Sequence, residues 1–401
     1  MENVYIVAAK RTAIGTFGGS FKKTPATQLA AEAIREVIKD AGVPAGDLGE
    51  VIVGNVLTNG QGMGPGRQAS IYAGVPDHVP AYTVNILCGS GMKTIMLAAD
   101  NIRLGEHGLA VAAGMENMSM APFTVPSSAR WGNKLGAMQV EDSLIQDGLT
   151  DVFNNYHMGV TAENIVRKHS ISREEQDAFA AESQRRAGEA RDSGRFKDEI
   201  VPVEVKDRRK TVTVDTDEHI RTETTVESLA GLKPAFEKEG TVTAGNASGL
   251  NDGGSAVLLA SESAVKKYGL KPMAQLIATS QAALDPSIMG LAPAPAVTKV
   301  LEKAGMSLKE MELIELNEAF AAQSLGVLKE LSADHEVSME WLKERTNVNG
   351  GAIALGHPLG ASGNRITVTL LHEMKKRGLK YGLASLCIGG GMATALIVKM
   401  L

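Results

Sequence analysis

The chain has 401 residues, of which 44% are hydrophobic and 22% charged, so it can bury one large core or two to three smaller ones. Glycine and proline are only modestly frequent and a net charge of −5 lacks a basic excess, which argues against fibrous, disordered and nucleic-acid-binding classes. No apolar run approaches the roughly 20 residues of a membrane span, and the first residues lack the basic start of a signal peptide.

Strand and helix patterns alternate in the first part of the chain. Val4 to Ala8 is predicted to be a buried strand. A helix follows to Ala41, with Pro25 suited to the first helical position and Gly42 to the end. Further strands are predicted at 50–57, leading into 84–87, and at 109–113, with helices near 68–73 and 92–102. This alternation predicts βαβ units and a mostly parallel sheet.

The pattern changes between Met115 and about Gly245, where the chain is methionine-rich and then strongly charged. A helix is predicted from Ser172 to about Arg191, opening with a capping box to Glu175. We interpret this stretch as an inserted lobe rather than as more core sheet.

A second α/β half is predicted after the lobe. Its strands are expected at 255–260, 313–316, 381–386 and 394–399, with helices after Asn317 and near 366–376. Leu87–Met92 resembles Leu386–Met392, with a cysteine followed by glycines in both. The halves therefore read as a diverged duplication whose two cysteines could meet at a pseudo-twofold centre.

Cys88 and His357 are the first candidates for chemistry. Cys88 follows a strand-like run and precedes Gly89 and a helix, a setting that favours a nucleophilic thiolate. His357 lies in a glycine-rich loop and is stiffened by Pro358, which suits a general base. An inert buried cysteine and a structural turn histidine are the alternatives for these two residues.

Cys387 ends a strand, and the N–H groups of the Ile388–Gly391 stretch after it could bind an anion while the thiol transfers a proton. A buried strand cysteine is the plainer alternative. Asn317 stands at a strand-to-helix junction as an amide donor or as a helix cap. With only these two cysteines and no CxxC pair, we expect neither a disulfide framework nor a structural zinc site, and a reducing, cytoplasmic compartment fits best.

In their order along the chain, these motifs carry a resemblance to a known family. Ile6–Gly15, Gly114–Ser119, Asn317–Phe320, Gly356–Pro358 and Cys387–Gly391 together resemble the thiolases, and specifically their short-chain, biosynthetic acetoacetyl-CoA members. The resemblance runs over essentially the whole chain. It implies an α/β thiolase fold, with two pseudo-repeated halves in an α-β-α-β-α arrangement. Residues 1–118 plus 246–270 would form the N-terminal half, 119–245 an inserted loop domain over the active site, and 271–401 the C-terminal half.

The resemblance also implies an activity, the reversible Claisen condensation of two acetyl-CoA to acetoacetyl-CoA and CoA, with no metal or other cofactor. Cys88 would accept the acyl group, His357 would activate it, and Cys387 would deprotonate the acetyl group. Asn317 would hold a water that shares the enolate oxyanion with His357. The N–H groups of Cys88 and Gly389 would form a second oxyanion hole. The family is usually a homotetramer, a dimer of dimers.

Residues that bind the CoA thioester follow from the same resemblance. His157 would contact the pantetheine side, and Met158 would narrow the acyl pocket. The plainer reading of this pair is a capped helix start with a core methionine. By position, Arg221 would lie near the adenine and Ser248 along the pantetheine arm. Met289 and Phe320 match the pocket that limits the substrate to acetyl or acetoacetyl groups. We expect only a solvent-exposed surface at the basic run Lys206, Arg208, Arg209 and Lys210.

Two features of the sequence depart from the family pattern. Ile86 replaces an often polar residue, and the segment from Leu331 to Arg345 is longer than expected, as a surface insertion would be.

A carrier-dependent ketoacyl synthase would have His or Asn in place of Cys387. A non-catalytic acyl-lipid carrier would have no use for the catalytic set. A serine hydrolase rests only on Ser90–Lys93, an incomplete motif. Mild oxidation could also join the two cysteines reversibly.

Overall fold

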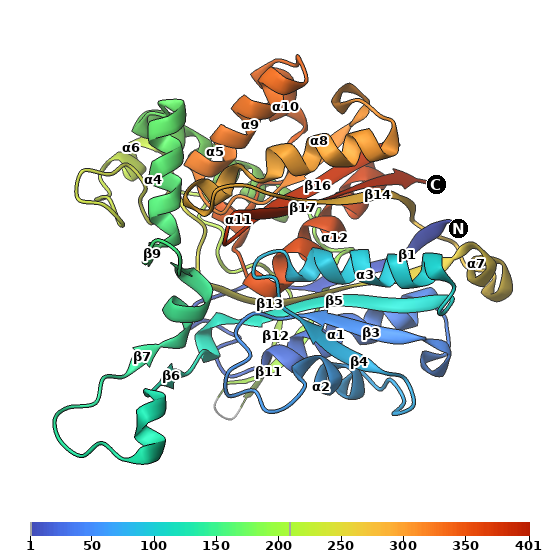
Figure 1. Cartoon of the computed structure of the whole chain (residues 1–401). Coiled ribbons are helices and arrows are strands. Elements are labelled where there is room, and N and C mark those ends of the chain that lie inside the picture. The colour runs from blue at the N-terminus through green and yellow to red at the C-terminus, as the bar shows by residue number, and fades with distance from the viewer. Residues whose placement is uncertain (1, 208–209) are drawn as a thin grey trace.

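The computed structural model describes residues 2–207 and 210–401, which form five stacked layers (Figure 1). Helices α3 (Ser90–Leu104) and α12 (Leu359–Arg377) lie in the middle, between two regions of a large sheet. The outer face of one sheet region is covered by α1 (Ala26–Ala41) and α2 (Pro65–Tyr72), and that of the other by α8 (Pro293–Ala304) and α9 (Ala321–Asp334). The expected α-β-α-β-α layering is confirmed.

The large sheet has eleven strands, and its two regions are joined where Tyr5 and Ile6 pair with Gln275 and Ala274. The strands are β1 (Val4–Thr12), β2 (Gly15–Thr16), β3 (Glu50–Gly54), β4 (Ala81–Val84), β5 (Leu109–Asn117), β10 (Ile200–Val201), β13 (Asn251–Ser261), β14 (Ala274–Ala283), β15 (Leu313–Leu316), β16 (Tyr381–Ile388) and β17 (Met392–Met400). One region has the order β1-β13-β5-β3-β4 and the other the order β15-β16-β17-β14.

The prediction of a mostly parallel sheet was wrong. The pairs β3–β4, β3–β5 and β15–β16 are parallel, whereas β1–β13, β5–β13, β1–β14, β14–β17 and β16–β17 are antiparallel. Parallel neighbours need a crossover connection, usually a helix. β16 and β17 are instead joined by a tight glycine turn, and β13 enters the sheet from the lobe.

Both faces of the central strands are buried, which explains their unbroken apolar sequences. In β3, Ile52 belongs to the core around the middle helices, whereas Val51 and Val53 belong to the core under the outer helices. Successive side chains of a strand point to opposite faces. A strand between two helix layers therefore needs apolar residues on both faces.

Several predicted boundaries hold and others shift. The left-handed Gly42 ends α1, as predicted, but Pro25 precedes the helix as its N-cap instead of occupying its first position. The capping box of Ser172 and Glu175 is present. The strand predicted to lead into Val84–Leu87 is present as β4, but it ends at Val84, and Leu87 has a positive φ of 55°.

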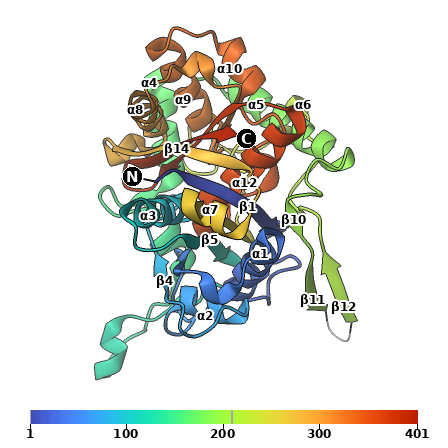
Figure 2. The same ribbon diagram turned by 90° about the vertical axis from the view of Figure 1, so that its right-hand side faces the viewer.

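Residues 119–245 form several small hairpins and helices that project from the layers (Figures 1 and 2). They are β6 (Phe123–Thr124) with β7 (Glu141–Asp142), β8 (Thr150–Asp151) with β9 (Tyr156–His157), β11 (Val203–Asp207) with β12 (Lys210–Val214), α4 (Met158–His169), α5 (Arg173–Asp192) and α6 (Val226–Ala230). β10 pairs with Arg11 and Thr12 of β1. The prediction that the stretch from Met115 to about Gly245 lies outside the core sheet was therefore wrong at β10 and at Met115–Asn117, which form the end of β5.

Short helices complete the chain. They are α7 (Glu262–Tyr268), α10 (Met339–Arg345), α11 (Ala352–Leu355), 3-10 turns at Ala45–Asp47, Met118–Met120, Ser127–Trp131, Pro286–Leu291 and Leu308–Glu310, and a π-helical turn at Leu144–Leu149. The segment predicted as a surface insertion forms the end of α9 and all of α10. Across residues 2–207 and 210–401, no helix combines the length and apolarity needed to cross a bilayer.

A buried ion-pair cluster fastens the lobe to β1. Arg11 donates to Glu199 at 2.6 Å and, through both terminal nitrogens, to Asp217 at 2.7 and 2.9 Å. All three side chains are buried. Burial alone would lower the pKa of Arg11, but the two carboxylates outweigh it and raise that pKa.

We predict that Asp217→Ala destabilises the protein by about 3–5 kcal/mol, because it leaves part of a buried guanidinium uncompensated. The measurement is the midpoint of urea unfolding followed by circular dichroism. Asp215→Ala, which removes an exposed carboxylate from the same segment, is the control. Equal midpoints for the two variants would contradict the prediction.

Candidate active site

A cavity of about 560 Å³ lies where the loops after β4, β15 and β16 meet the lobe. Most of the residues singled out from the sequence line it. They are Cys88, Met158, Ser248, Met289, Phe320, His357, Cys387 and Gly389. Both cysteines are free. The structure thus brings together residues that are up to 301 positions apart in the sequence, from Cys88 to Gly389.

The Cys88 loop is held in an unusual backbone conformation. Leu87 has a positive φ, and the Ser90 hydroxyl donates to its carbonyl at 2.6 Å while accepting from the Ile86 N–H at 2.9 Å. A side chain at Gly89 would meet Ile388, since an added Cβ would lie 2.1 Å from its Cδ1. Gly89 therefore lets the Cys88 loop approach the end of β16.

The half-buried Cys88 thiol is kept protonated by its surroundings. Burial raises its pKa to about 11, although hydrogen bonds from the backbone N–H groups of Gly389 and Cys88 itself lower it. These two N–H groups thus converge on the sulfur. They form a small anion-binding arrangement at the atom predicted to be the nucleophile.

His357 is a buried, neutral imidazole with a defined tautomer. Burial, with a smaller contribution from the charge of Arg365, lowers its pKa to about 3. Nδ1 lies 2.5 Å from the Ser362 hydroxyl, which donates its own proton to the Pro358 carbonyl at 2.9 Å. Nδ1 must then be the protonated nitrogen. Nε2 keeps a lone pair and can accept a proton.

Asn317 lies directly behind His357. Its Nδ2 is 3.4 Å from His357 Nε2, and the side chain is buried. Its Oδ1 has no hydrogen-bond partner among the residues described. The helix-cap alternative does not apply, because α9 starts at Ala321 with Phe320 as its N-cap. Asn317 is therefore available for a polar ligand beside the imidazole.

Cys387 is the penultimate residue of β16 and fully buried. Burial and the proximity of Cys88 raise the pKa of its thiol well above the usual range. The turn that follows has positive φ at Gly390 and Gly391. This turn reverses the chain into β17 and leaves the Gly389 N–H facing Cys88.

Three further residues, which the sequence analysis did not single out, hold the segment around His357 in place. Buried Glu116 accepts from the backbone N–H groups of Val56, Leu57 and Gly360. Burial raises its pKa to about 7. Asn251 accepts from the His357 N–H, and Ser362 fixes the imidazole. Glu116 lies in a motif quoted above, but nothing in its local sequence indicates this role.

Two predicted binding residues lie outside the cavity wall. His157 caps α4 by accepting from the Gly159 N–H at 3.0 Å, as its plainer reading had it. Its ring stacks on Phe236 at 4.6 Å, and Phe236 in turn meets the edge of Phe320. Phe236 thus connects His157 to the cavity, and a lone aromatic residue in a charged loop gave no signal of this.

Arg221 lines a separate hollow of about 320 Å³ beside His219 and Gly245. Gly245 lines this hollow and Ser248, three residues further along the chain, lines the cavity, so this stretch of chain connects the two. In the basic run, Lys206 and Lys210 are exposed and Arg208 and Arg209 lie outside the described residues. Sequence reasoning also missed residues 146–153, which form one wall of the cavity.

The sequence matches two domains of a known protein family over most of its length. Residues 4–263 match the thiolase N-terminal domain, and residues 270–400 match the thiolase C-terminal domain. The chain belongs to the thiolase family.

Full-length relatives agree with this thiolase assignment. The chain is 54% identical to acetyl-CoA acetyltransferase of Pseudomonas aeruginosa, with 99% of each chain covered. A crystal structure of the Bacillus anthracis acetyl-CoA acetyltransferase shares 47% identity at a TM-score of 0.96, covering 100% and 99% of the two chains. Human mitochondrial 3-ketoacyl-CoA thiolase in complex with CoA shares 45% identity at a TM-score of 0.93, covering 100% and 98%.

We predict that alkylation of Cys88 accelerates as pH rises from 7 to 10, about tenfold per unit, without a plateau. The thiolate fraction grows with pH below a pKa of about 11, and His357 is neutral throughout this range because its pKa is about 3. The measurement is the rate of iodoacetamide labelling, followed by mass spectrometry of the Cys88 peptide. A flat profile would indicate a stable thiolate–imidazolium pair instead.

Proposed function

We propose that this thiolase is an acetyl-CoA C-acetyltransferase, which condenses two acetyl-CoA to acetoacetyl-CoA and CoA and catalyses the reverse thiolysis. One observation carries the proposal. Two thiols and one neutral imidazole converge on a single cavity, in a chain about half identical to enzymes that bear this name. A Claisen condensation needs a nucleophile, a carbon base and oxyanion stabilisation, and this set can supply all three.

The first half-reaction transfers an acetyl group to Cys88. His357 Nε2 takes the thiol proton as the sulfur attacks the thioester carbonyl. The carbonyl oxygen becomes an oxyanion that accepts hydrogen bonds from the N–H groups of Cys88 and Gly389. The bond to the CoA sulfur then breaks, and the proton taken from Cys88 ends on the departing CoA thiol. Acetyl-Cys88 retains the reactivity of a thioester.

The second half-reaction forms the carbon–carbon bond. His357 Nε2 takes the proton of the Cys387 thiol, and the resulting thiolate removes an α-proton from a second acetyl-CoA. The protonated imidazole and a water held on Asn317 stabilise the enolate oxygen. The enolate carbon attacks acetyl-Cys88, the carbon–sulfur bond breaks, and the Cys88 sulfur takes the proton held by His357, which leaves Cys387 as a thiol. A thiolate formed at buried Cys387 is a strong base, because burial raises the pKa of that thiol.

The cavity wall favours short acyl groups. Met158, Met289 and Phe320 are all buried and line the space beside the two cysteines. We assign Ser248 and His157 to the pantetheine arm and Arg221 to the adenine end, along the connection between the two hollows. The substrates are CoA thioesters, and the reaction as written uses no other cofactor.

The experiment is intact-mass measurement after incubation with acetyl-CoA. Wild type is expected to gain one acetyl group, about 42 Da, on Cys88, and Cys88→Ala is expected to gain none. Cys387→Ala is the matched control at the second thiol. It should still become acetylated but should lose acetoacetyl-CoA formation by at least about a thousandfold, because the carbon base is gone. Acetylation of Cys88→Ala would refute the nucleophile assignment.

The wider organisation is part of the same proposal. Residues 1–118 with 246–270, 119–245, and 271–401 act as N-terminal half, covering loop domain and C-terminal half. The loop domain contributes residues 146–153 and Met158 to the cavity wall. The free thiols suit a reducing, cytoplasmic compartment.

We also infer a homotetramer. The hairpin between β6 and β7 projects into solvent (Figure 1) and exposes Phe123, Val125, Trp131, Leu135 and Val140. Such a set of exposed apolar side chains is typical of an interface between subunits. Four copies meeting through these hairpins would bury it.

We predict that Trp131→Asp combined with Leu135→Asp reduces the assembly from a tetramer to a dimer, because charges would be buried at the interface. Light scattering after size-exclusion chromatography measures the mass. Lys134→Asp, which changes an exposed and already charged residue of the same hairpin, serves as the control. A tetramer that survives the double substitution would contradict the interface.

A further inference from the structure

Glu116, near the end of β5, is fully buried, and its carboxylate accepts four hydrogen bonds. Oε1 accepts from Asn55 Nδ2 at 2.7 Å and from the Leu57 N–H at 3.1 Å. Oε2 accepts from the Val56 N–H at 3.0 Å and from the Gly360 N–H at 2.9 Å. Each oxygen thus faces two donors. The ionised carboxylate fits this site, whereas a protonated carboxyl would direct its own hydrogen at one of them.

One side of this arrangement leads to the Cys88 loop. The Val56 carbonyl accepts from Asn85 Nδ2 at 3.3 Å, and Asn85 Oδ1 accepts from the Leu87 N–H at 2.9 Å. Leu87 and Cys88 both pack against the apolar cluster that contains Val56. Val56 and Asn85 therefore connect Glu116 with the backbone of the residue directly before the proposed nucleophile.

The other side leads to His357. Gly360 is the second residue of α12 and lies three residues after His357. A Cβ at Gly360 would lie 3.0 Å from Glu116 Oε2 and 2.8 Å from the Cα of Asn55, so glycine lets the start of the helix come this close. The first N–H groups of a helix have no partner within the helix, and a negative charge is favourable there. Glu116 thus anchors the helix that begins just after the proposed base.

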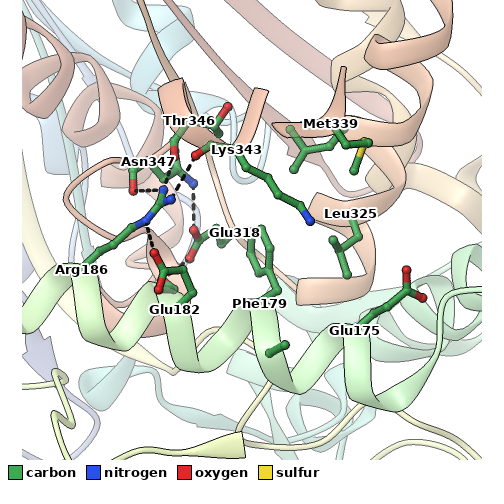
Figure 3. Close-up of a pocket in the computed structure, with 13 residues that line it drawn as sticks. Glu175, Phe179, Glu182, Arg186, Glu318, Leu325, Met339, Lys343, Thr346 and Asn347 are labelled. Carbon is green, nitrogen blue, oxygen red and sulfur yellow. Dashed lines mark hydrogen bonds and ion pairs between the residues drawn. The ribbon is translucent and has the colours of Figure 1, made fainter. Parts of the chain in front are cut away.

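A second buried carboxylate near His357 has different partners. Glu318 accepts from Asn347 Nδ2 at 2.9 Å and from the Ile353 N–H at 3.3 Å, and both of these residues lie in the segment before His357 (Figure 3). Its third donor is the Ser183 hydroxyl of α5. Glu116 differs because its donors lead to both the thiol and the imidazole.

We propose that Glu116 is a positioning residue for the acetyl-transfer step. Its ionised carboxylate ties the loop beside Cys88 to the first turn of α12 and so sets the distance between the thiol and the His357 imidazole. This inference rests on the proposed function, since it concerns the proton transfer from Cys88 to His357. The residues that line the cavity do not include Glu116, so it acts on the reacting groups without touching the substrate.

The elements around Glu116 leave its charge without a neighbouring cation. Its donors from α12 and from the loop after β3 are uncharged backbone and amide groups. On β13 the residue opposite Glu116 is Gly253, and the neighbouring Asp252 is bound by Ser119 instead. Cys88 is a titratable group that does face Glu116, whose charge contributes to the raised pKa of the thiol.

The positioning role makes the rate of acetyl transfer depend on pH. Burial raises the pKa of Glu116 to about 7, although its four hydrogen bonds lower it. The carboxylate that ties the two segments together is therefore present above this pKa and is lost as the pH falls through it. The pKa values of His357 and Cys88 are about 3 and about 11, so neither group titrates between about pH 5.5 and about pH 8.5.

The test is the rate at which acetyl-CoA at saturating concentration acetylates Cys88, followed by rapid quenching and intact-mass measurement. The wild-type rate is expected to rise from about pH 5.5 to about pH 8.5 with a midpoint near the pKa of Glu116. Glu116→Gln resembles the protonated form in size. It should acetylate at least about tenfold more slowly than wild type at the upper end of this range, with a flat pH profile and an unchanged KM for acetyl-CoA.

Two further variants separate positioning from a general loss of structure. Glu50→Gln is the matched control, because Glu50 is a buried carboxylate at the other end of β3, bound by Asn101 at 2.6 Å. It should acetylate as wild type does at every pH. Asn85→Ala breaks the connection to Leu87 without removing a charge, so it should slow acetylation and keep the wild-type midpoint.

The wild-type profile and Asn85→Ala decide the question even where Glu116→Gln does not fold. A flat wild-type profile would overturn the inference, as would Asn85→Ala or Glu116→Gln acetylating as fast as wild type. A wild type that is not acetylated at any pH would overturn the proposed function itself, and this inference with it.

Discussion

The geometry of the site depends on how closely α3 and α12 approach each other. A Cβ at Gly91 would lie 2.8 Å from the Asn364 N–H nitrogen, and one at Gly363 would lie 2.6 Å from the Met92 nitrogen. Any side chain at either position would push the helices apart. Cys88 lies just before α3 and His357 just before α12, so glycine at these two crossing points sets the separation of the proposed nucleophile and the proposed base.

This backbone contact also explains the electrostatics of the site. Two buried helices exclude water, so Cys88, Cys387 and His357 are all held in their neutral forms by burial. Hydrogen bonds replace the water that these groups lack. Ser362 orients His357, and the Gly389 N–H faces Cys88. In such a dry site, a charge that develops during reaction interacts more strongly with fixed N–H groups than it would in water.

The sequence was most informative where a residue type and its local backbone requirement coincide. A cysteine between a strand and a glycine-started helix identifies Cys88, and glycines on both sides identify His357. Contacts between distant segments left no such local signal. Glu116 meets Gly360 across 244 positions, and Phe236 reaches Phe320 only through the fold. The prediction of a mostly parallel sheet was wrong for a related reason. The β16–β17 hairpin and the lobe before β13 decide which strands are antiparallel, and local periodicity does not reveal either connection.

The segment from Asn317 to Phe320 contributes side chains to two separate cavities. Phe320 and Ala319 line the active-site cavity and Asn317 meets His357, whereas Glu318 lines a separate cavity between α5, α9 and α10. The alternation of side chains that follows β15 separates Asn317 from Glu318, and a bend at Ala319 precedes Phe320. Glu318 also accepts hydrogen bonds from Asn347 and Ile353, which precede His357 by ten and four residues. The wall between the two cavities is therefore part of the support for His357, the proposed general base.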